Sequence, residues 1–151
     1  MEFDAFNEIR NLDIAYWSYA DSCSETFVED LFLPTGILQL GDLKLSGRQE
    51  IKEFFLNRLE NNLKIKRITR HLVSNNSYKM EDSETIKGKA QLLVFSGIGK
   101  ELPLSVSLPS TIADVEDIYV KDLDNKWKYQ NKVILPVFIG EGAPLFALRE
   151  K

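Results

Sequence analysis

Hydrophobic positions at the start of the chain recur at helical spacing. Phe6, Ile9, Tyr16 and Ala20 fall on one face when this segment is wound as an α-helix, and such a stripe is what a helix buries against a core. Acidic residues precede the stripe, which suits the positive end of a helix dipole. We therefore expect a first helix that ends near Asp21.

Capping signals predict two more helices. Ser22-Cys23-Ser24-Glu25 and Ser46-Gly47-Arg48-Gln49 both have capping-box spacing, because a serine is followed three residues later by Glu or Gln. The first of these helices should run to about residue 31, and Pro34 and Gly36 should break it. The second should end at Asn61-Asn62.

From residue 65 onward the hydrophobic pattern alternates with a period of two, which is typical of β-strands with one buried face. We expect a short hairpin at 36–45 that turns at Gly41-Asp42. Four long strands should follow, at about 65–80, 84–96, 111–122 and 126–139. The apolar connection at 97–110 is predicted to be a lid or a contact surface. Helices first and antiparallel strands afterwards predict an α+β fold, a cone-shaped curved sheet that encloses a pocket with the helices.

Composition and charge narrow the class of protein. The chain has 151 residues, 44% of them hydrophobic, which suits one domain over 1–151 with a core at about 5–139 and an apolar tail at 140–151. The net charge of −4 argues against a nucleic-acid partner. No apolar stretch has the length of a membrane span, and the N-terminus is acidic where a signal peptide would be basic. Cys23 is the only cysteine, so no internal disulfide is expected, and we predict a cytoplasmic protein.

Five segments, in order along the chain, resemble SnoaL-like domains of the nuclear-transport-factor-2-like superfamily. They are Ile9-x-x-Leu12-x-x-x-Tyr16-x-x-x-x-Asp21, Gly47-Arg48-x-x-Ile51, Arg70-His71-Leu72-Val73-Ser74-Asn75, Asp114-x-Glu116-Asp117 and Trp127-Lys128-Tyr129 with Lys132. The resemblance implies a six-stranded curved sheet, three helices, an internal cavity and frequent dimers. Relatives include dehydratases, isomerases and non-catalytic dioxygenase small subunits, so the fold alone does not define a function.

The same resemblance singles out a candidate catalytic pair. In the dehydratase-like and dehydrochlorinase-like branches, an Asp at the end of the first helix works with a His on the first long strand, and Asp21 and His71 occupy these positions. A carboxylate beside an imidazole fixes its tautomer and stabilises its protonated form, which suits a general base. Tyr16, Trp17 and Asn75 are the candidate substrate-binding residues, with Asn75 expected on the same strand face as His71.

Other observations argue for structural roles. His71 is the only histidine, whereas scytalone-dehydratase-like sites use two, and Ala20 stands where those sites have a tyrosine. A lone strand histidine is often only hydrogen-bonded, and Asp21 would also suit a helix cap. Lys132 is expected to form a structural ion pair with Glu116 or Asp117. One His and one Cys cannot form the usual zinc sites, and we expect no metal and no cofactor.

The leading hypothesis is a cofactor-independent lyase or isomerase that acts on a hydrophobic small molecule by His71–Asp21 acid–base chemistry. The alternatives are a non-catalytic protein that binds a small apolar ligand, and a structural partner like a dioxygenase small subunit. A homodimer is expected through the outer face of the sheet, where apolar residues are predicted to gather. They are Leu93, Phe95, Ile134 and Phe138.

Overall fold

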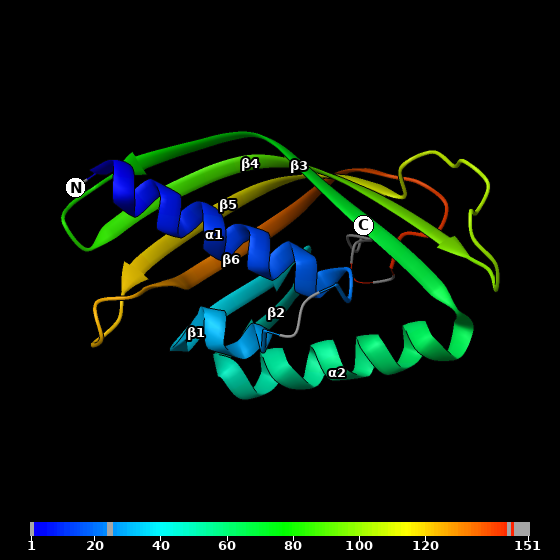
Figure 1. Ribbon diagram of the computed structural model, residues 1–151, viewed down its shortest axis with the longest axis horizontal. Helices are drawn as coiled ribbons and strands as arrows, with labels where there is room; N and C mark the ends of the chain where they lie inside the picture. The colour runs from blue at the N-terminus through cyan, green and yellow to red at the C-terminus, as the bar shows by residue number, and fades with distance from the viewer. Residues whose placement is uncertain (1, 24–25, 145, 147–151) are drawn as a thin grey trace.

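The computed structural model describes residues 2–23, 26–144 and 146 of the chain. Its elements follow in chain order (Figure 1). They are α1 (Glu2–Ala20), the 3-10 turn η1 (Val28–Leu31), β1 (Phe32–Leu40), β2 (Leu43–Ser46), α2 (Gly47–Ile65), β3 (Arg67–Met80), β4 (Thr85–Ile98), β5 (Thr111–Lys121) and β6 (Trp127–Ile139). None of the helices in these ranges is long and apolar enough to cross a membrane.

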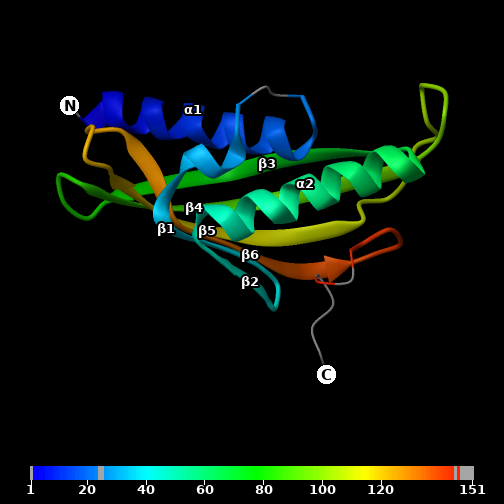
Figure 2. The same ribbon diagram turned by 90° about the horizontal axis from the view of Figure 1, so that it is seen from below.

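The six strands form one sheet in the order β2-β1-β6-β5-β4-β3. All neighbouring strands are antiparallel except β1 and β6, which are parallel. Both α-helices lie over the same face of the curved sheet, and the sheet does not close on itself (Figure 2). The predicted α+β cone with a mostly antiparallel six-stranded sheet is therefore confirmed.

The predicted second helix is wrong over the residues that are described. Only the single turn η1 forms there, and Ser24-Glu25 of the expected capping box lie outside the described residues. Pro34 and Gly36 do not end a helix either, because β1 runs through both of them. At this point the pairing of β1 with β6 changes register. A Cβ on Gly36 would lie 3.0 Å from the Tyr129 carbonyl oxygen, so the close approach of the two strands requires glycine here.

Helix α2 continues through Asn61-Asn62, where it was predicted to end, and stops at Ile65. The helical preference of asparagine is only a few tenths of a kcal/mol below that of good helix formers, so these two residues are not enough to end the helix. Lys66 then adopts a left-handed conformation (φ 58°), and its N–H bonds the carbonyls of Asn62 and Leu63. The four predicted long strands are confirmed to within about two residues at each end.

A bulge interrupts β3 just beyond His71. The pairing with β4 shifts between Ser74 and Ser77, and Asn75 has φ 54°. The extra residue breaks the alternation of faces. As a result, Asn75 does not share the face of His71 as the strand period predicted. Its side chain is exposed and donates to Gln91 Oε1 at 2.6 Å.

The core lies between the helices and the concave face of the sheet. Large aromatic side chains fill its centre, and Tyr16 packs edge-on against Phe32, Phe55 and Tyr129. Ile134, predicted to lie on the outer face, is 8% exposed and belongs to this core. Phe138 is 66% exposed, as expected for the outer face.

The connection predicted to be a lid or a contact surface and the apolar tail lie differently with respect to the pocket. The connection 99–110 leaves Leu102, Val106 and Leu108 exposed, and of this connection only Ser110 lines the cavity described below. The tail instead reaches the cavity, where Pro144 and Phe146 line its wall. The Phe146 ring packs edge-on against Phe54 with 5.5 Å between centroids.

Candidate functional site

A cavity of about 380 Å³ opens between α1, α2 and the concave face of the sheet. We call it the main cavity. Apolar side chains form most of its wall, among them Tyr16, Trp17, Phe54, Phe55, Leu92 and Ile134. Polar groups line one part of it, including Arg58, Arg67, Thr69 and His71. This volume and this mixture of side chains are typical of small-molecule sites.

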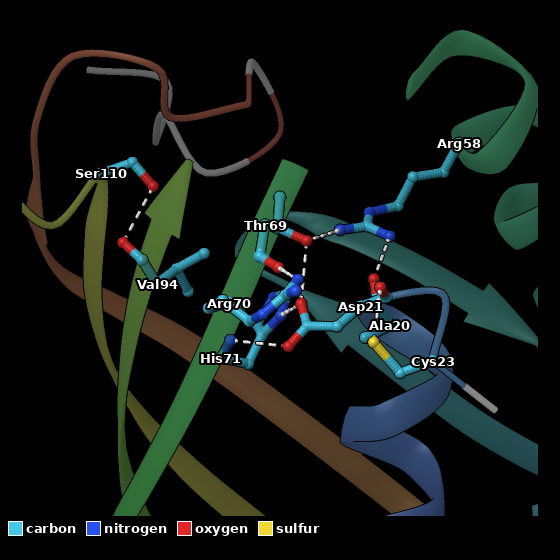
Figure 3. Close-up of polar contacts among 9 residues, drawn as sticks. All are labelled: Ala20, Asp21, Cys23, Arg58, Thr69, Arg70, His71, Val94 and Ser110. Carbon is cyan, nitrogen blue, oxygen red and sulfur yellow. Dashed lines mark hydrogen bonds and ion pairs between the residues drawn. The ribbon is translucent and has the colours of Figure 1, made fainter. Parts of the chain in front are cut away.

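The structure brings Asp21 into contact with His71 (Figure 3), and His71 lines the main cavity. The His71 ring nitrogen Nδ1 lies 2.6 Å from Asp21 Oδ1, and the His71 backbone N–H donates to Asp21 Oδ2 at 2.9 Å. The two side chains are only 11% and 9% exposed. An ionised carboxylate held this way can accept the Nδ1 proton, which leaves Nε2 of the ring with its lone pair free to act as a base.

Two further side chains hold the Asp21 carboxylate in place. Thr69, two residues before His71 on β3, donates its hydroxyl to Asp21 Oδ1 at 2.8 Å. Arg58, on α2, donates to the Ala20 carbonyl at 2.5 Å and to Thr69 Oγ1 at 3.3 Å (Figure 3). The end of α1, the middle of α2 and the start of β3 are thereby connected. Arg58 and Thr69 were not predicted from the sequence as site residues. The only sequence signal for Thr69 was that it should share a strand face with His71.

The surroundings of Asp21 keep it ionised. Burial by itself raises the pKa of the Asp21 carboxyl, but hydrogen bonds and charge from His71, with a hydrogen bond from Thr69, outweigh burial and hold this pKa below its ordinary value. Asp21 therefore remains an acceptor at neutral pH. The helix-capping role considered for Asp21 is not seen among the described residues, because both carboxylate oxygens bond β3.

Trp17 links His71 to a buried lysine. Its ring stacks on the His71 imidazole with 5.3 Å between centroids, and the Lys132 ammonium lies 4.9 Å from the same indole. The Lys132 ammonium also contacts the rings of Tyr16 and Tyr129. Such cation–π contacts to a fully buried ammonium hold the aromatic wall in a fixed arrangement.

Lys132 is fully buried and pairs with Asp117. An ion pair of Lys132 with either Glu116 or Asp117 was predicted from the sequence. The Lys132 Nζ donates to Asp117 Oδ2 at 2.9 Å, whereas the other candidate, Glu116, is exposed and lies 3.8 Å from Lys89. A buried lysine surrounded by aromatic rings and one carboxylate has a structural role here. Neither Lys132 nor Asp117 lines the main cavity.

A buried polar cluster beneath α1 was not predicted. The Asp13 carboxylate accepts hydrogen bonds from the hydroxyls of Tyr78, Tyr119 and Tyr129 at 2.5 to 3.0 Å. Tyr119 also contacts Asp117 Oδ2 at 3.0 Å. Asp13 lies in the predicted first helix, but its three partners are 65, 106 and 116 residues away. No local pattern signals such a contact.

Asp117 should make the stability of the protein depend on pH. Burial raises the pKa of Asp117 from 3.8 to about 6, although Lys132 opposes this shift. The folded protein therefore binds a proton that the unfolded chain has lost between about pH 4 and pH 6. The contribution of Asp117 to stability is complete below pH 4 and falls as the pH rises through 6, by about 3 kcal/mol in total.

Urea unfolding of the wild type and of Asp117→Asn at pH 4 and pH 7 measures this contribution. The asparagine variant cannot titrate and keeps a side chain of the same shape. We expect the wild type to lose stability relative to the variant as the pH rises, by about 3 kcal/mol. A difference between the two proteins that is the same at both pH values would show that the carboxyl does not titrate in this window.

A second cavity of about 590 Å³ lies on the other side of His71 and is lined in part by Arg10, Asp21 and Cys23. We call it the outer cavity. Trp17 and His71 line both cavities and form a shared wall. Cys23 is exposed, and its thiol contacts the Asp21 carbonyl at 3.3 Å. Within the described ranges, no three His, Cys, Asp or Glu side chains gather as metal ligands would.

Of the five residues proposed from the sequence, four line one or both cavities. Tyr16 and Trp17 line the main cavity, and Asp21 and His71 are in contact at the shared wall. Asn75 lines neither cavity. The residue that follows it, Asn76, lines the outer cavity instead. The bulge in β3 adds one residue to the strand, so the face expected for Asn75 is taken by Asn76.

The fold agrees with comparisons to known proteins. The SnoaL-like domain family matches residues 1–132, so the chain belongs to this family. A comparison with curated proteins found no match.

Solved structures share the architecture at low sequence identity. A provisionally assigned scytalone dehydratase from Novosphingobium aromaticivorans has a TM-score of 0.76 and 16% identity, over 95% of this chain and 91% of that one. ActVI-ORFA from Streptomyces coelicolor has a TM-score of 0.76 and 12% identity, over 91% and 98% of the two chains. A Catenulispora acidiphila protein in complex with S-DNPA has a TM-score of 0.69 and 15% identity, over 88% and 93%. At these identities the likeness concerns the fold alone.

Proposed function

We propose that the protein is a cofactor-independent lyase or isomerase that binds a hydrophobic small molecule in the main cavity. His71 is the general base in this proposal, and Asp21 orients it. The observation that supports it most is the 2.6 Å contact between His71 Nδ1 and Asp21 Oδ1 at the wall of a largely apolar cavity. A base removed from bulk water, with a fixed tautomer, is suited to taking a proton from carbon.

The proposed reaction needs few groups. With Nδ1 directed at Asp21, the ring takes the substrate proton at Nε2 and becomes an imidazolium. The adjacent carboxylate stabilises this cation, and the electron pair of the broken C–H bond expels a leaving group or moves into a neighbouring carbonyl. Tyr16 and Trp17 supply an apolar surface for the substrate. A base placed this way contributes about 10²–10⁴-fold in rate.

A chromogenic elimination tests for a base inside the cavity before the natural substrate is known. In 5-nitrobenzisoxazole, the base removes the ring C–H proton, the electron pair of that bond forms the nitrile, and the N–O bond breaks. The product is a coloured cyanophenolate, so its absorbance measures the rate of proton removal. We expect saturable turnover by the wild type that exceeds the rate with an equal concentration of free imidazole. Turnover no faster than free imidazole would contradict the proposal.

Asp21→Asn should slow this elimination by about 10- to 100-fold. The variant no longer offers a negative charge to the imidazolium and no longer defines which ring nitrogen carries the proton. The loss should be in kcat, with KM nearly unchanged, because Asp21 does not line the main cavity. Thr69→Ser, which keeps the hydroxyl that bonds Asp21, is the matched control and should stay within about threefold of the wild type, an order-of-magnitude estimate. An unchanged kcat in Asp21→Asn would contradict the orienting role.

A non-catalytic ligand-binding protein is the second candidate, supported by the mostly apolar wall of the main cavity. This function predicts saturable ligand capture that does not depend on the His71 imidazole. The structural role of a dioxygenase small subunit and the homodimer stay predictions, and the exposed Phe138 on the outer face is the feature in their favour. The molar mass in solution, measured by light scattering for the wild type and Phe138→Ser, tests the homodimer.

A further inference from the structure

The main cavity has an unequal distribution of charge. Among its described lining residues, Arg58 and Arg67 carry permanent positive charge, and neither Asp nor Glu is present. Asp21 contributes to the outer cavity instead. A cavity that is mostly apolar and has two guanidinium groups in its wall presents a positive potential to any molecule that enters, and the low polarity of the wall strengthens this potential.

Arg58 is bound to the protein without being neutralised by a carboxylate. Its two donated hydrogen bonds go to the Ala20 carbonyl and the Thr69 hydroxyl, which are neutral acceptors. Burial lowers the pKa of Arg58; Tyr16 and Asp21 oppose this, and the nearby charge of Arg67 lowers it further. The two guanidinium groups line the same cavity, and their like charges repel each other. A guanidinium with neutral partners in a partly dry site retains a strong preference for an anion.

Arg67 is the less satisfied of the two. It lies at the start of β3, is partly buried, and lines the main cavity. Its Nε is buried without a hydrogen-bond partner among the described residues. An unpaired buried donor is costly, and most of these groups in native proteins have a partner that is protein, water or ligand. Arg67 therefore brings to this wall a charged group whose hydrogen bonds within the described protein are incomplete.

We infer that the main cavity selects organic anions, and that its ligand is an aromatic carboxylate or a carboxylate of similar shape whose charged group lies at Arg67 and Arg58. The apolar part of the ligand packs against Phe54, Leu92 and Ile134, which line the same cavity. Arginine suits this role because its planar fork of donors matches a carboxylate. This inference adds a ligand class to the proposed function. It depends on that proposal in one respect, that the main cavity is the ligand site.

This placement also connects the anion to the base. Arg58 bonds Thr69, Thr69 bonds Asp21, and Asp21 bonds His71 in one continuous chain of contacts of 3.3, 2.8 and 2.6 Å. A carboxylate at Arg58 therefore fixes one end of the ligand close to the imidazole. The rest of the ligand extends along the apolar wall, so a carbon next to the carboxylate end is the position that His71 would reach.

The experiment compares 2-naphthoate with its neutral analogue 2-naphthamide, which has nearly the same size and shape. Titration calorimetry with the wild type should show that the naphthoate binds at least about tenfold more tightly. In Arg67→Gln this preference should fall to about twofold or less, with little change in affinity for the naphthamide. Arg67→Lys keeps the charge without the fork and should retain an intermediate preference.

Arg70→Gln is the matched control. Arg70 lies three residues further along β3, is exposed, and lines neither cavity. Its guanidinium donates to the neighbouring Thr69 carbonyl (Figure 3). The substitution Arg70→Gln removes one positive charge from the same strand as Arg67→Gln, but outside the main cavity. The preference for naphthoate should therefore not change. The inference is overturned if the wild type binds both probes equally or binds neither at millimolar concentration. It is also overturned if Arg67→Gln and Arg70→Gln have equal effects.

The outcome separates this inference from the proposed function. If naphthoate is not preferred but the chromogenic elimination still depends on His71, the base is retained and the assigned ligand class is wrong. If naphthoate is preferred through Arg67 but the elimination is no faster than with free imidazole, the cavity selects anions and the catalytic proposal is wrong.

Discussion

His71→Gln should lower kcat/KM for elimination of 5-nitrobenzisoxazole by about 10²–10⁴-fold, the usual contribution of a positioned general base. Glutamine fills a similar volume and can still donate to Asp21, but its amide is not a base at neutral pH. The fold should be retained, because His71 contributes one hydrogen-bonded side chain to a network in which Thr69 still bonds Asp21. The measurement is initial-rate kinetics with circular dichroism of the same samples.

Two controls show whether the loss is chemical or structural. Leu72→Gln changes the adjacent residue of β3, whose side chain is 53% exposed, and should leave the rate within about twofold of the wild type, because surface substitutions usually have small effects. His71→Ala with added imidazole should recover part of the lost rate, since the base can then enter the space left by the side chain. Failure of this rescue together with loss of structure in His71→Gln would assign His71 a structural role instead.

Lys132→Met should lower the free energy of unfolding by about 3–5 kcal/mol at pH 7, the cost of leaving one member of a buried ion pair without its partner. Asp117 is 6% exposed and, among the described residues, would keep only the 3.0 Å contact of its Oδ2 with the Tyr119 hydroxyl. The three cation–π contacts of the ammonium would be lost as well. Urea unfolding followed by tryptophan fluorescence is the direct measurement.

Lys89→Met, on β4, is the matched control, because its pair with Glu116 is exposed and 3.8 Å long. Its effect should be within about 1 kcal/mol. The double variant Lys132→Met/Asp117→Asn should recover at least about 1 kcal/mol relative to the sum of its single variants, because it leaves no unpaired carboxylate. The loss in Lys132→Met should also shrink at pH 5, below the pKa of Asp117 at about 6. Equal effects of Lys132→Met and Lys89→Met would contradict the structural importance of the buried pair.

Some predictions from local signals were wrong. Pro34 and Gly36 were expected to break a helix, yet they lie inside β1, where its pairing with β6 is interrupted between Phe32 and Ile37. Asn62 was predicted to end a helix, but the helical preference of asparagine is only a few tenths of a kcal/mol lower, and α2 continues to Ile65. Asn75 was placed with His71 by the period of two, and a bulge in β3 shifts that period.

The sequence by itself determined the order and type of most elements, because hydrophobic periods of 3.6 and 2 depend only on neighbours along the chain. The resemblance to SnoaL-like domains further indicated Asp21 and His71 as a pair. The partner of Lys132 in an ion pair was predicted to be either Glu116 or Asp117. Each of these features can be seen in a short segment of the sequence or in the order of such segments along the chain. A strand or helix must present one face to the core, whatever the details of its partners.

Only the tertiary structure decided what surrounds the pair. Arg58 contacts a carbonyl 38 residues away, and Asp13 bonds a tyrosine 116 residues away. Such contacts depend on the curvature of the sheet and on where two helices cross it, and no short segment encodes either. The cavity wall, its two arginines and the tail residue Phe146 that lines it are for the same reason properties of the assembled fold.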